Sequence, residues 1–292
     1  MNAVYKPIAL TGLFFALYVA SSHLDAPLGH ALAGACGDLC PAHVPGEVPP
    51  ALLIALCVVR TGLIALIALV IARLNRSSFL AFGFRPFAWW QLLWGVLSGV
   101  VGISAVIGCL VMGGFVQFEG VHERGLSALG YGVVWALGMA LVGLSEEMAF
   151  RGAPVFLLSK VSPALAVVVS AAAFVMVHMG NDNESGYGLL QIGLFGAVCA
   201  ISVLRTRSLA WAIGFHGAWD WTLEYMYGAV GSGYVFQGHL LSQTTKGPVW
   251  ATGGSAGVEG SVVSYIVLAA IGALMLIGKM PGLGRRHTGG VD

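Results

Sequence analysis

Charged side chains are scarce in this sequence. Only 9% of its 292 residues are Asp, Glu, Lys or Arg, whereas 58% are hydrophobic and the mean hydropathy is +0.86. Soluble domains normally carry about 25% charged residues, so this composition excludes a soluble globular protein and indicates a polytopic membrane protein. The net charge is only +1, and no stretch of the sequence is strongly basic. No nucleic-acid partner is therefore expected.

A serine or cysteine nucleophile also lacks support. Ser145 has no obvious dedicated base in the sequence. Three cysteines fall inside apolar segments without an adjacent histidine: Cys57, Cys109 and Cys199. Cysteines in such a setting act as small hydrophobic residues, so catalytic groups are expected among other residue types.

Lys and Arg are absent from the stretch His23–Pro50, which we predict to be a long loop. Cys36 and Cys40 lie in it at C-x3-C spacing. A disulfide between them is expected if the loop faces an oxidising compartment. A zinc site there is disfavoured because His43 alone does not complete a ligand set.

Long apolar runs are what the sequence has in abundance. Its length allows roughly eight spans of about 20 residues each. They are expected at 7–20, 51–72, 91–115, from 129 through 151, 163–178, 187–204, 209–227 and 261–278. The first run is short, and Ala20–Ser22 resembles a cleavage region, so a signal peptide is an alternative to the uncleaved span that we favour. A Gly-rich stretch at 228–260 separates the last two spans.

The predicted fold class is therefore all-α, a polytopic membrane protein with about eight transmembrane helices and a site inside the helix bundle. The sequence shows neither an internal repeat nor a low-complexity linker. Residues 1–292 are accordingly expected to form a single integral-membrane domain.

Basic residues indicate how the chain is oriented. If the N-terminus is cytoplasmic, Arg124 and Lys246 fall outside and Arg60 lies within a span, where a structural role is expected. The other basic residues then fall on the cytoplasmic side: Lys6, Arg73, Arg76, Arg85, Arg151, Lys160, Arg205, Arg207, Lys279, Arg285 and Arg286. Cytoplasmic loops carry an excess of Lys and Arg, so we expect both termini to be cytoplasmic.

The stretch Ser145–Arg151 places two carboxylates and a guanidinium in an apolar run that begins near Leu129. Ionisable residues inside a membrane helix are costly and mark functional sites. Glu147 and Arg151 are four residues apart and lie on one helix face, so they are expected to pair. Glu146 points about 100° away. One carboxylate is thus expected to be structural and the other free to do chemistry.

Two further spans carry polar residues that need explaining. The fifth ends at His178, four residues after Phe174, and the seventh carries His216 and Asp220 on one face, with Glu224 a turn further on. Each of these residues could also have a purely structural role. His178 could lie at the membrane interface, Phe174 could pack in the apolar core, and His216 could form a hydrogen bond with Asp220 within one helix. Occurring together, these groups favour a shared site, because the membrane penalises each of them.

Depth along the helices tests whether these groups can meet. If the fourth helix continues past Arg151 to Lys160, Glu146 lies about 21 Å from its cytoplasmic end, and His178 lies about 22 Å into its own helix. His216 is shallower, at roughly 10–13 Å. Helix tilt would have to supply the difference.

A carboxylate with two imidazoles and a further acid can activate water. Glu146 would be the general base, and His178 would orient the water or share its proton. His216 and Asp220 would face the oxyanion of a tetrahedral intermediate. The same four side chains could instead hold one divalent metal ion such as zinc, so a metal-free and a metal-dependent hydrolase both remain open.

The three motifs resemble those of the CPBP intramembrane proteases, a family named for CAAX prenyl proteases and bacteriocin-processing proteins. They are Glu146-Glu147-x-x-x-Arg151, Phe174-x-x-x-His178 and His216-x-x-x-Asp220. The Gly-rich run Thr252–Ser261 also resembles a segment common in bacterial members. Together these motifs cover roughly 141–261, which the resemblance marks as the catalytic core.

The resemblance implies an intramembrane endopeptidase acting on a peptide or membrane-protein substrate in the lipid bilayer, with Glu146 and His178 activating water. A bacterial inner membrane is the expected location. Some members have Asn where this chain has Asp220, and an ionised Asp cannot donate to an oxyanion. Asp220 is therefore protonated, or binds a metal, or holds His216 in the correct tautomer. The alternatives to a protease are a catalytically silent scaffold or bacteriocin-immunity protein of the same fold and, less favoured, a proton-coupled transporter.

Overall fold

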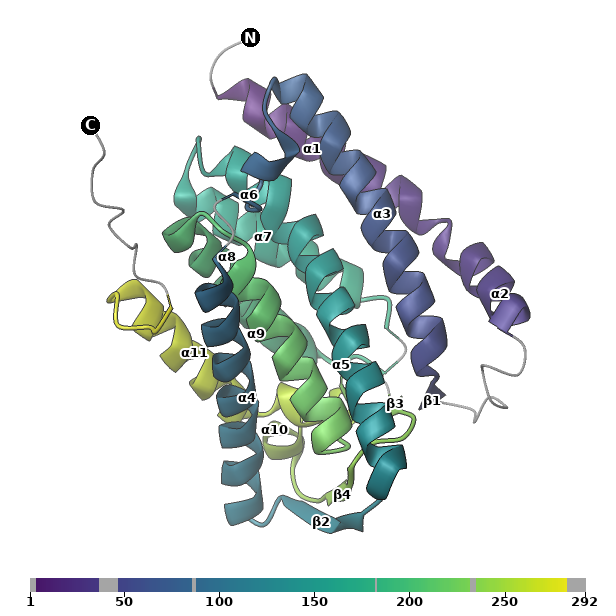
Figure 1. Ribbon diagram of the computed structural model, residues 1–292. Coiled ribbons are helices and arrows are strands. Elements are labelled where there is room, and N and C mark those ends of the chain that lie inside the picture. The colour runs from purple at the N-terminus through teal and green to yellow at the C-terminus, as the bar shows by residue number, and fades with distance from the viewer. Residues whose placement is uncertain (1–3, 37–46, 86–87, 182, 232–234, 283–292) are drawn as a thin grey trace.

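Helices form most of the regular structure in the computed structural model, which describes residues 4–36, 47–85, 88–181, 183–231 and 235–282 (Figure 1). The longer helices are α1 (Tyr5–Ser22), α2 (Asp25–Cys36), α3 (Pro50–Asn75), α4 (Trp89–Met112), α5 (Gly125–Glu147), α7 (Pro163–His178), α8 (Gly186–Thr206), α9 (Ala210–Asp220) and α11 (Val262–Leu276). The short helices are α6 (Ala153–Leu158) and α10 (Val249–Thr252). The all-α prediction is confirmed.

Tighter and wider turns connect several of these helices. The 3-10 turns are η2 (Phe79–Ala81), η5 (Gly254–Ala256) and η6 (Val258–Gly260), and the π-helical turns are η3 (Met148–Gly152) and η4 (Trp221–Met226). The strands are β1 (Glu47–Val48), β2 (Val116–Val121), β3 (Val235–Phe236) and β4 (Leu241–Thr245).

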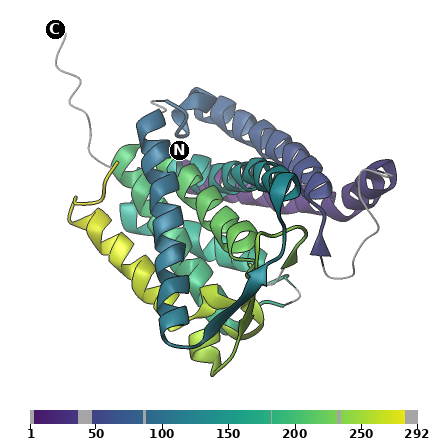
Figure 2. The same cartoon turned by 60° about the horizontal axis from the view of Figure 1, so that its bottom comes forward.

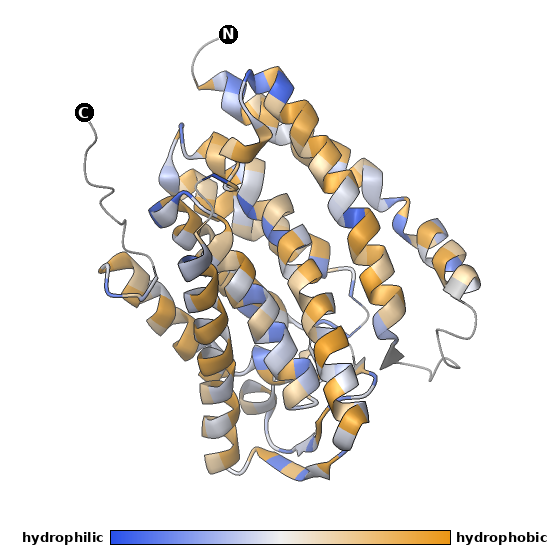
Figure 3. Ribbon diagram, viewed as in Figure 1, coloured by the Kyte–Doolittle hydropathy of each residue, from blue (hydrophilic) through white to orange (hydrophobic). Residues whose placement is uncertain are grey.

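Four helical stretches in the described part of the chain are long and apolar enough to cross a membrane: Pro50–Asn75, Trp89–Met112, Gly125–Leu158 and Gly186–Thr206. The bent pair α1 and α2, with an angle of 42° between them, would make a fifth span. The expected count of eight is not confirmed, because α7, α9 and α11 have only 16, 11 and 15 residues. A straight span needs about 20 residues. Figure 3 shows the helices as mostly hydrophobic, with hydrophilic residues part-way along α3 and α9.

The stretch His23–Pro50 is not a plain loop as expected, because it contains α2 and β1. Asp25 lies in the first turn of α2, where the helix dipole stabilises a negatively charged side chain. Arg60 of α3 places Nη2 3.5 Å from Asp25 Oδ2 and 3.1 Å from the Tyr18 hydroxyl. Arg60 therefore links three helices, in keeping with a structural role. The predicted Cys36–Cys40 disulfide lies outside the described residues.

Helix α9 occupies the centre of the bundle, between α4 and α5 (Figure 1). Every residue from Ala210 to Trp219 is buried. Glycines make this close packing possible: a Cβ on Gly99 of α4 would lie 2.5 Å from the Phe215 carbonyl oxygen, and one on Gly214 would lie 2.3 Å from the Leu92 carbonyl oxygen. Small residues of this kind let membrane helices approach backbone to backbone.

One end of the bundle is covered by strands where loops were expected. Strand β2 crosses from the end of α4 to the start of α5 and pairs with β4 in antiparallel orientation, with Val116 opposite Thr245 (Figure 2). Strands β1 and β3 pair in parallel. The Gly-rich stretch 228–260 therefore folds back over the bundle, and its strand β4 is held by β2.

Candidate active site

Two of the sequence motifs lie at π-helical turns. Glu147 is the last residue of α5 before η3, and Asp220 is the last residue of α9 before η4. Pro154 is the second residue of α6 and has no N–H to donate to residue 150, which accounts for the widening after Glu147. Wider turns of this kind occur frequently at functional sites. The helix then continues to Leu158, as the depth argument required.

Glu147 and Arg151 form the expected pair, with Arg151 Nη1 3.2 Å from Glu147 Oε1 and both side chains fully buried. The guanidinium also lies over the Phe174 ring, 4.2 Å from its centroid. No nitrogen of the guanidinium makes a well-aligned hydrogen bond within the described part of the chain. Its charge thus faces one carboxylate and two aromatic rings, those of Phe174 and, at 5.8 Å, Phe150.

Glu147 has a second partner that the spacing in sequence does not reveal. Its Oε1 accepts a hydrogen bond from Nδ1 of His216 at 2.7 Å. An ionised carboxylate can only accept, so Nδ1 of His216 carries a proton. Glu147 therefore fixes the orientation of His216 as well as compensating Arg151, which is the supporting arrangement expected around a functional histidine.

The other nitrogen of His216 faces two carboxylates. Nε2 lies 3.6 Å from Glu146 Oε2 and 3.5 Å from Asp220 Oδ2. These separations exceed ordinary hydrogen-bond lengths and leave room for a bridging water or substrate atom. Glu146 and Asp220 are 26% and 17% exposed, so both reach open space, whereas Glu147 does not.

His178 is oriented by its own helix. Its Nδ1 lies 2.8 Å from the Phe174 carbonyl oxygen, which can only accept, so Nδ1 carries a proton and Nε2 is an acceptor in the neutral ring. The Phe174 ring lies between the two histidines, 4.5 Å from the His178 ring and 5.9 Å from the His216 ring. Phe174 thus packs against both and against Arg151.

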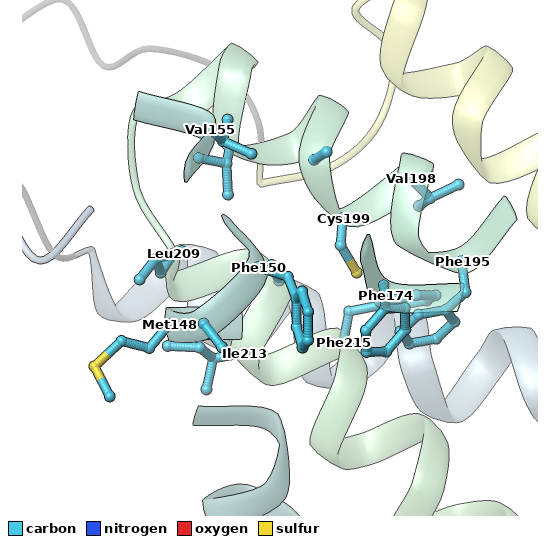
Figure 4. Packing of buried hydrophobic residues seen from close by; sticks show 14 of the residues in the cluster. Met148, Phe150, Val155, Phe174, Phe195, Val198, Cys199, Leu209, Ile213 and Phe215 are labelled. Carbon is cyan, nitrogen blue, oxygen red and sulfur yellow. The ribbon is translucent and has the colours of Figure 1, made fainter. Parts of the chain in front are cut away.

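Aromatic residues enclose this polar group. Figure 4 shows Phe150, Phe174, Phe195 and Phe215 gathered together within the buried hydrophobic cluster. The Phe195 ring lies 5.0 Å from both Phe215 and His216. The apolar surroundings strengthen electrostatic interactions between the polar groups that they enclose.

A cavity of about 400 Å³ joins these elements. Its lining includes all four predicted site residues, Glu146, His178, His216 and Asp220. It also includes polar residues that the sequence analysis did not assign to the site: Arg60, Asn181, Gln191, Glu224 and Glu259. Glu224 was signalled by its place one turn after Asp220, whereas Glu259 lies in the Gly-rich stretch and carried no periodic signal.

A divalent metal does not fit the arrangement of these side chains. Within the described residues, no group of three or more His, Cys, Asp or Glu side chains is placed to hold a metal ion. No step is therefore assigned to a metal.

Comparison with known proteins identifies the segment that carries the motifs. Residues 128–222 match the family model described as "Type II CAAX prenyl endopeptidase Rce1-like". Over this range the chain is similar to that family. The match confirms the resemblance to the CPBP intramembrane proteases. No curated protein and no solved structure matches the chain.

The Rce1-like range begins within α5 and ends within η4. It contains all four predicted site residues together with Glu147, Arg151 and Phe174. Glu224 and Glu259 lie beyond it, although both line the same cavity. The protein is thus an integral membrane protein with a protease-like segment at its centre.

Proposed function

We propose that this protein is an intramembrane endopeptidase, which hydrolyses peptide bonds in or near the membrane. One observation carries the proposal: α5, α7 and α9 bring Glu146, His178, His216 and Asp220 to a single cavity inside an apolar helix bundle. The Rce1-like match over the same helices supports a hydrolase of the CAAX-protease type. Its partner would be a peptide or membrane-protein substrate that enters from the bilayer.

Glu146 and His178 would activate the attacking water. The water donates one hydrogen bond to Glu146 and one to Nε2 of His178, the unprotonated nitrogen of that ring. As the water oxygen bonds to the scissile carbonyl carbon, its proton passes to Glu146, which later returns it to the leaving amine. Glu146 suits this role because, unlike Glu147, it has no cationic partner within the ion-pair distance among Lys and Arg of the described chain.

His216 and Asp220 would stabilise the developing oxyanion. Glu147 holds Nδ1 of His216, so Asp220 is not needed to fix the tautomer. A proton on Nε2 would then point into the gap that separates His216 from Glu146 and Asp220. An oxyanion in this gap would accept from His216 and, where Asp220 is protonated, from Asp220 as well.

The orientation proposed here has both termini in the cytoplasm, and the proposed location is a bacterial inner membrane. Basic residues gather at the helix ends that this orientation makes cytoplasmic. The single-domain organisation of residues 1–292 and the limits 141–261 of the catalytic core stay predictions.

Replacing Glu146 tests the general-base assignment. We expect Glu146→Gln to lower cleavage of membrane peptides by about 10²–10⁴-fold, the usual contribution of general acid–base catalysis, because the amide cannot take a proton from water. The matched control is Glu119→Gln, which changes an exposed carboxylate of β2 and should leave cleavage unchanged. Full activity in the Glu146→Gln variant would overturn the assignment. If the folded wild type cleaves no peptide in a broad pool, the silent scaffold or immunity protein becomes the better interpretation.

Removal of metal tests the alternative mechanism. Because the site does not fit a metal ion, we expect wild-type activity to survive dialysis against a chelator and elemental analysis to find no stoichiometric zinc. Activity that is lost with the chelator and restored by added zinc would reinstate the metal-dependent hydrolase. The Glu119→Gln variant, treated in the same way, controls for non-specific loss during dialysis.

A further inference from the structure

The cavity contains two carboxylates besides those of the four proposed catalytic residues. Glu224 and Glu259 join Glu146 and Asp220 in its lining. Arg60 is the single Lys or Arg among the described lining residues, and its guanidinium already faces Asp25 at 3.5 Å. We call Glu224 and Glu259 the acidic wall of the cavity. The proposed chemistry uses Asp220 and leaves Glu224 and Glu259 without a role.

Glu224 is the part of this wall that most needs a partner. Its side chain follows Asp220 by one turn, and the residue is only 7% exposed. Its Oε2 atom has no hydrogen-bond partner within the described residues. Gly231 packs closely against the other carboxylate oxygen, since a Cβ on Gly231 would lie 2.2 Å from Glu224 Oε1. A buried carboxylate oxygen without a partner carries a desolvation cost, and the residue that bears this oxygen is part of the cavity lining.

Glu259 is held in place by two side chains of the helix bundle. Its Oε1 accepts a hydrogen bond from Nε1 of Trp219 at 2.8 Å, and Nε2 of Gln191 lies 3.5 Å away. Trp219 belongs to the central helix α9 and Gln191 to α8, so both donors are part of the rigid bundle. The acidic wall is therefore a preorganised surface built by α8, α9, η4 and η6.

We propose that the acidic wall receives a cationic side chain, lysine or arginine, of the substrate peptide near the bond to be cleaved. Several carboxylates in a low-dielectric cavity attract a positive charge far more strongly than they would in water. The cavity volume of about 400 Å³ falls in the range of ligand pockets and leaves room for a long side chain. This inference rests on the proposed protease function and adds a substrate preference to it.

The test compares two peptides that differ only in charge. One fluorescent membrane peptide carries lysine at a position scanned across the cleavage site, and the other carries norleucine, an uncharged side chain of similar length. Binding is measured by fluorescence anisotropy with the full-length protein in nanodiscs, and cleavage is measured in parallel. At one or more positions we expect the wild type to bind the lysine peptide about tenfold more tightly, as for one hydrogen bond to a charged group.

The Glu224→Gln substitution tests whether the acidic wall causes the preference for the lysine peptide. In Glu224→Gln the lysine-to-norleucine affinity ratio should fall below about twofold, because the amide keeps the shape of the side chain but loses its charge. Glu119→Gln should keep the wild-type ratio. Equal wild-type affinity for both peptides at every position would overturn the inference, as would a ratio that Glu224→Gln leaves unchanged. The comparison of the two peptides on the wild-type protein tests the inference even if the Glu224→Gln variant fails to fold.

The two readouts separate this inference from the proposed function. Cleavage of both peptides without a lysine preference would leave the protease intact and overturn the inference. A lysine preference in binding without any cleavage would uphold the acidic wall as a cation-binding surface and overturn the protease.

Discussion

Two adjacent carboxylates, Glu146 and Glu147, have opposite surroundings. Glu147 is fully buried and contacts both Arg151 and His216, whereas Glu146 is 26% exposed to the cavity. A single residue step around the helix, about 100°, produces this difference. The expected consequence is a division of labour in which one acid maintains the structure and its neighbour reacts.

Removal of Glu147 should therefore destabilise the protein. In Glu147→Ala the buried guanidinium of Arg151 loses its carboxylate partner and His216 loses its hydrogen bond. Breaking a buried pair in this way costs about 3–5 kcal/mol, which should appear as a large drop in the thermal unfolding midpoint in detergent. Glu146→Ala, the control on the adjacent residue, should unfold within a few degrees of the wild type.

A second substitution, added to Glu147→Ala, tests whether the unpaired charge of Arg151 causes the loss of stability. The double variant Glu147→Ala/Arg151→Met lacks the unpaired buried guanidinium and should recover part of the lost stability, since an apolar side chain at residue 151 needs no charged partner. Equal stability of Glu147→Ala and the wild type would contradict the structural role of this pair.

The sequence could predict the local half of the site but not the long-range half. Glu147 pairs with Arg151 on its own helix, as the four-residue spacing indicates. The contact from Glu147 to His216 joins residues 69 positions apart, and no periodicity reports such a contact. Counting depth from each helix end also left His216 too shallow, because such a count assumes that all helix ends lie in one plane.

At the scale of elements, the α4–α9 contact positions His216 and Asp220. Gly99 of α4 faces Phe215 and Trp219 of α9, and a Cβ there would come within 2.5 Å of a backbone oxygen. Gly99→Ala should force the two helices apart at a cost of about 1–3 kcal/mol and lower cleavage. Thermal unfolding and cleavage rate measure the two effects.

The same helix supplies the control. Gly108 of α4 has no atom within 4 Å of the position that a Cβ would take, so Gly108→Ala should be neutral or slightly stabilising. Equal behaviour of the Gly99 and Gly108 variants would show that close packing of α4 on α9 does not limit stability or activity.

Hydropathy predicted the long helices because membrane helices are long apolar runs. It did not predict the secondary structure of segments in which polar and apolar residues are mixed. The segment 116–121 has alternating character and forms β2, which becomes a strand only because β4 lies beside it. Helix α2 was missed because its polar and small residues resemble a loop, although Asp25 and the distant Arg60 hold it. In each case a tertiary partner decides the local structure.

At the scale of the whole molecule, the basic residues mark one end of the bundle. Arg205 Nη1 donates to the Leu276 carbonyl oxygen at the end of α11, and Arg207 Nη1 lies 3.1 Å from the Ser159 hydroxyl after α6. The ends of α6, α8 and α11 therefore meet at the same side, and the β2–β4 strands cover the opposite side (Figure 1). Arg151 was counted among the cytoplasmic residues, but it is buried in the site and contributes nothing to this bias.

Cysteine labelling can decide which of these ends faces the cytoplasm. Ser78 stands exposed between α3 and α4 at the basic end, and Thr244 stands exposed on β4 at the other end. In a variant without the native cysteines, an added Thr244→Cys should react with a membrane-impermeant maleimide in intact cells, because the positive-inside bias places β4 outside. An added Ser78→Cys, a change of matched size, should react only after permeabilisation. The reverse pattern would overturn the proposed orientation and place both termini outside the cytoplasm.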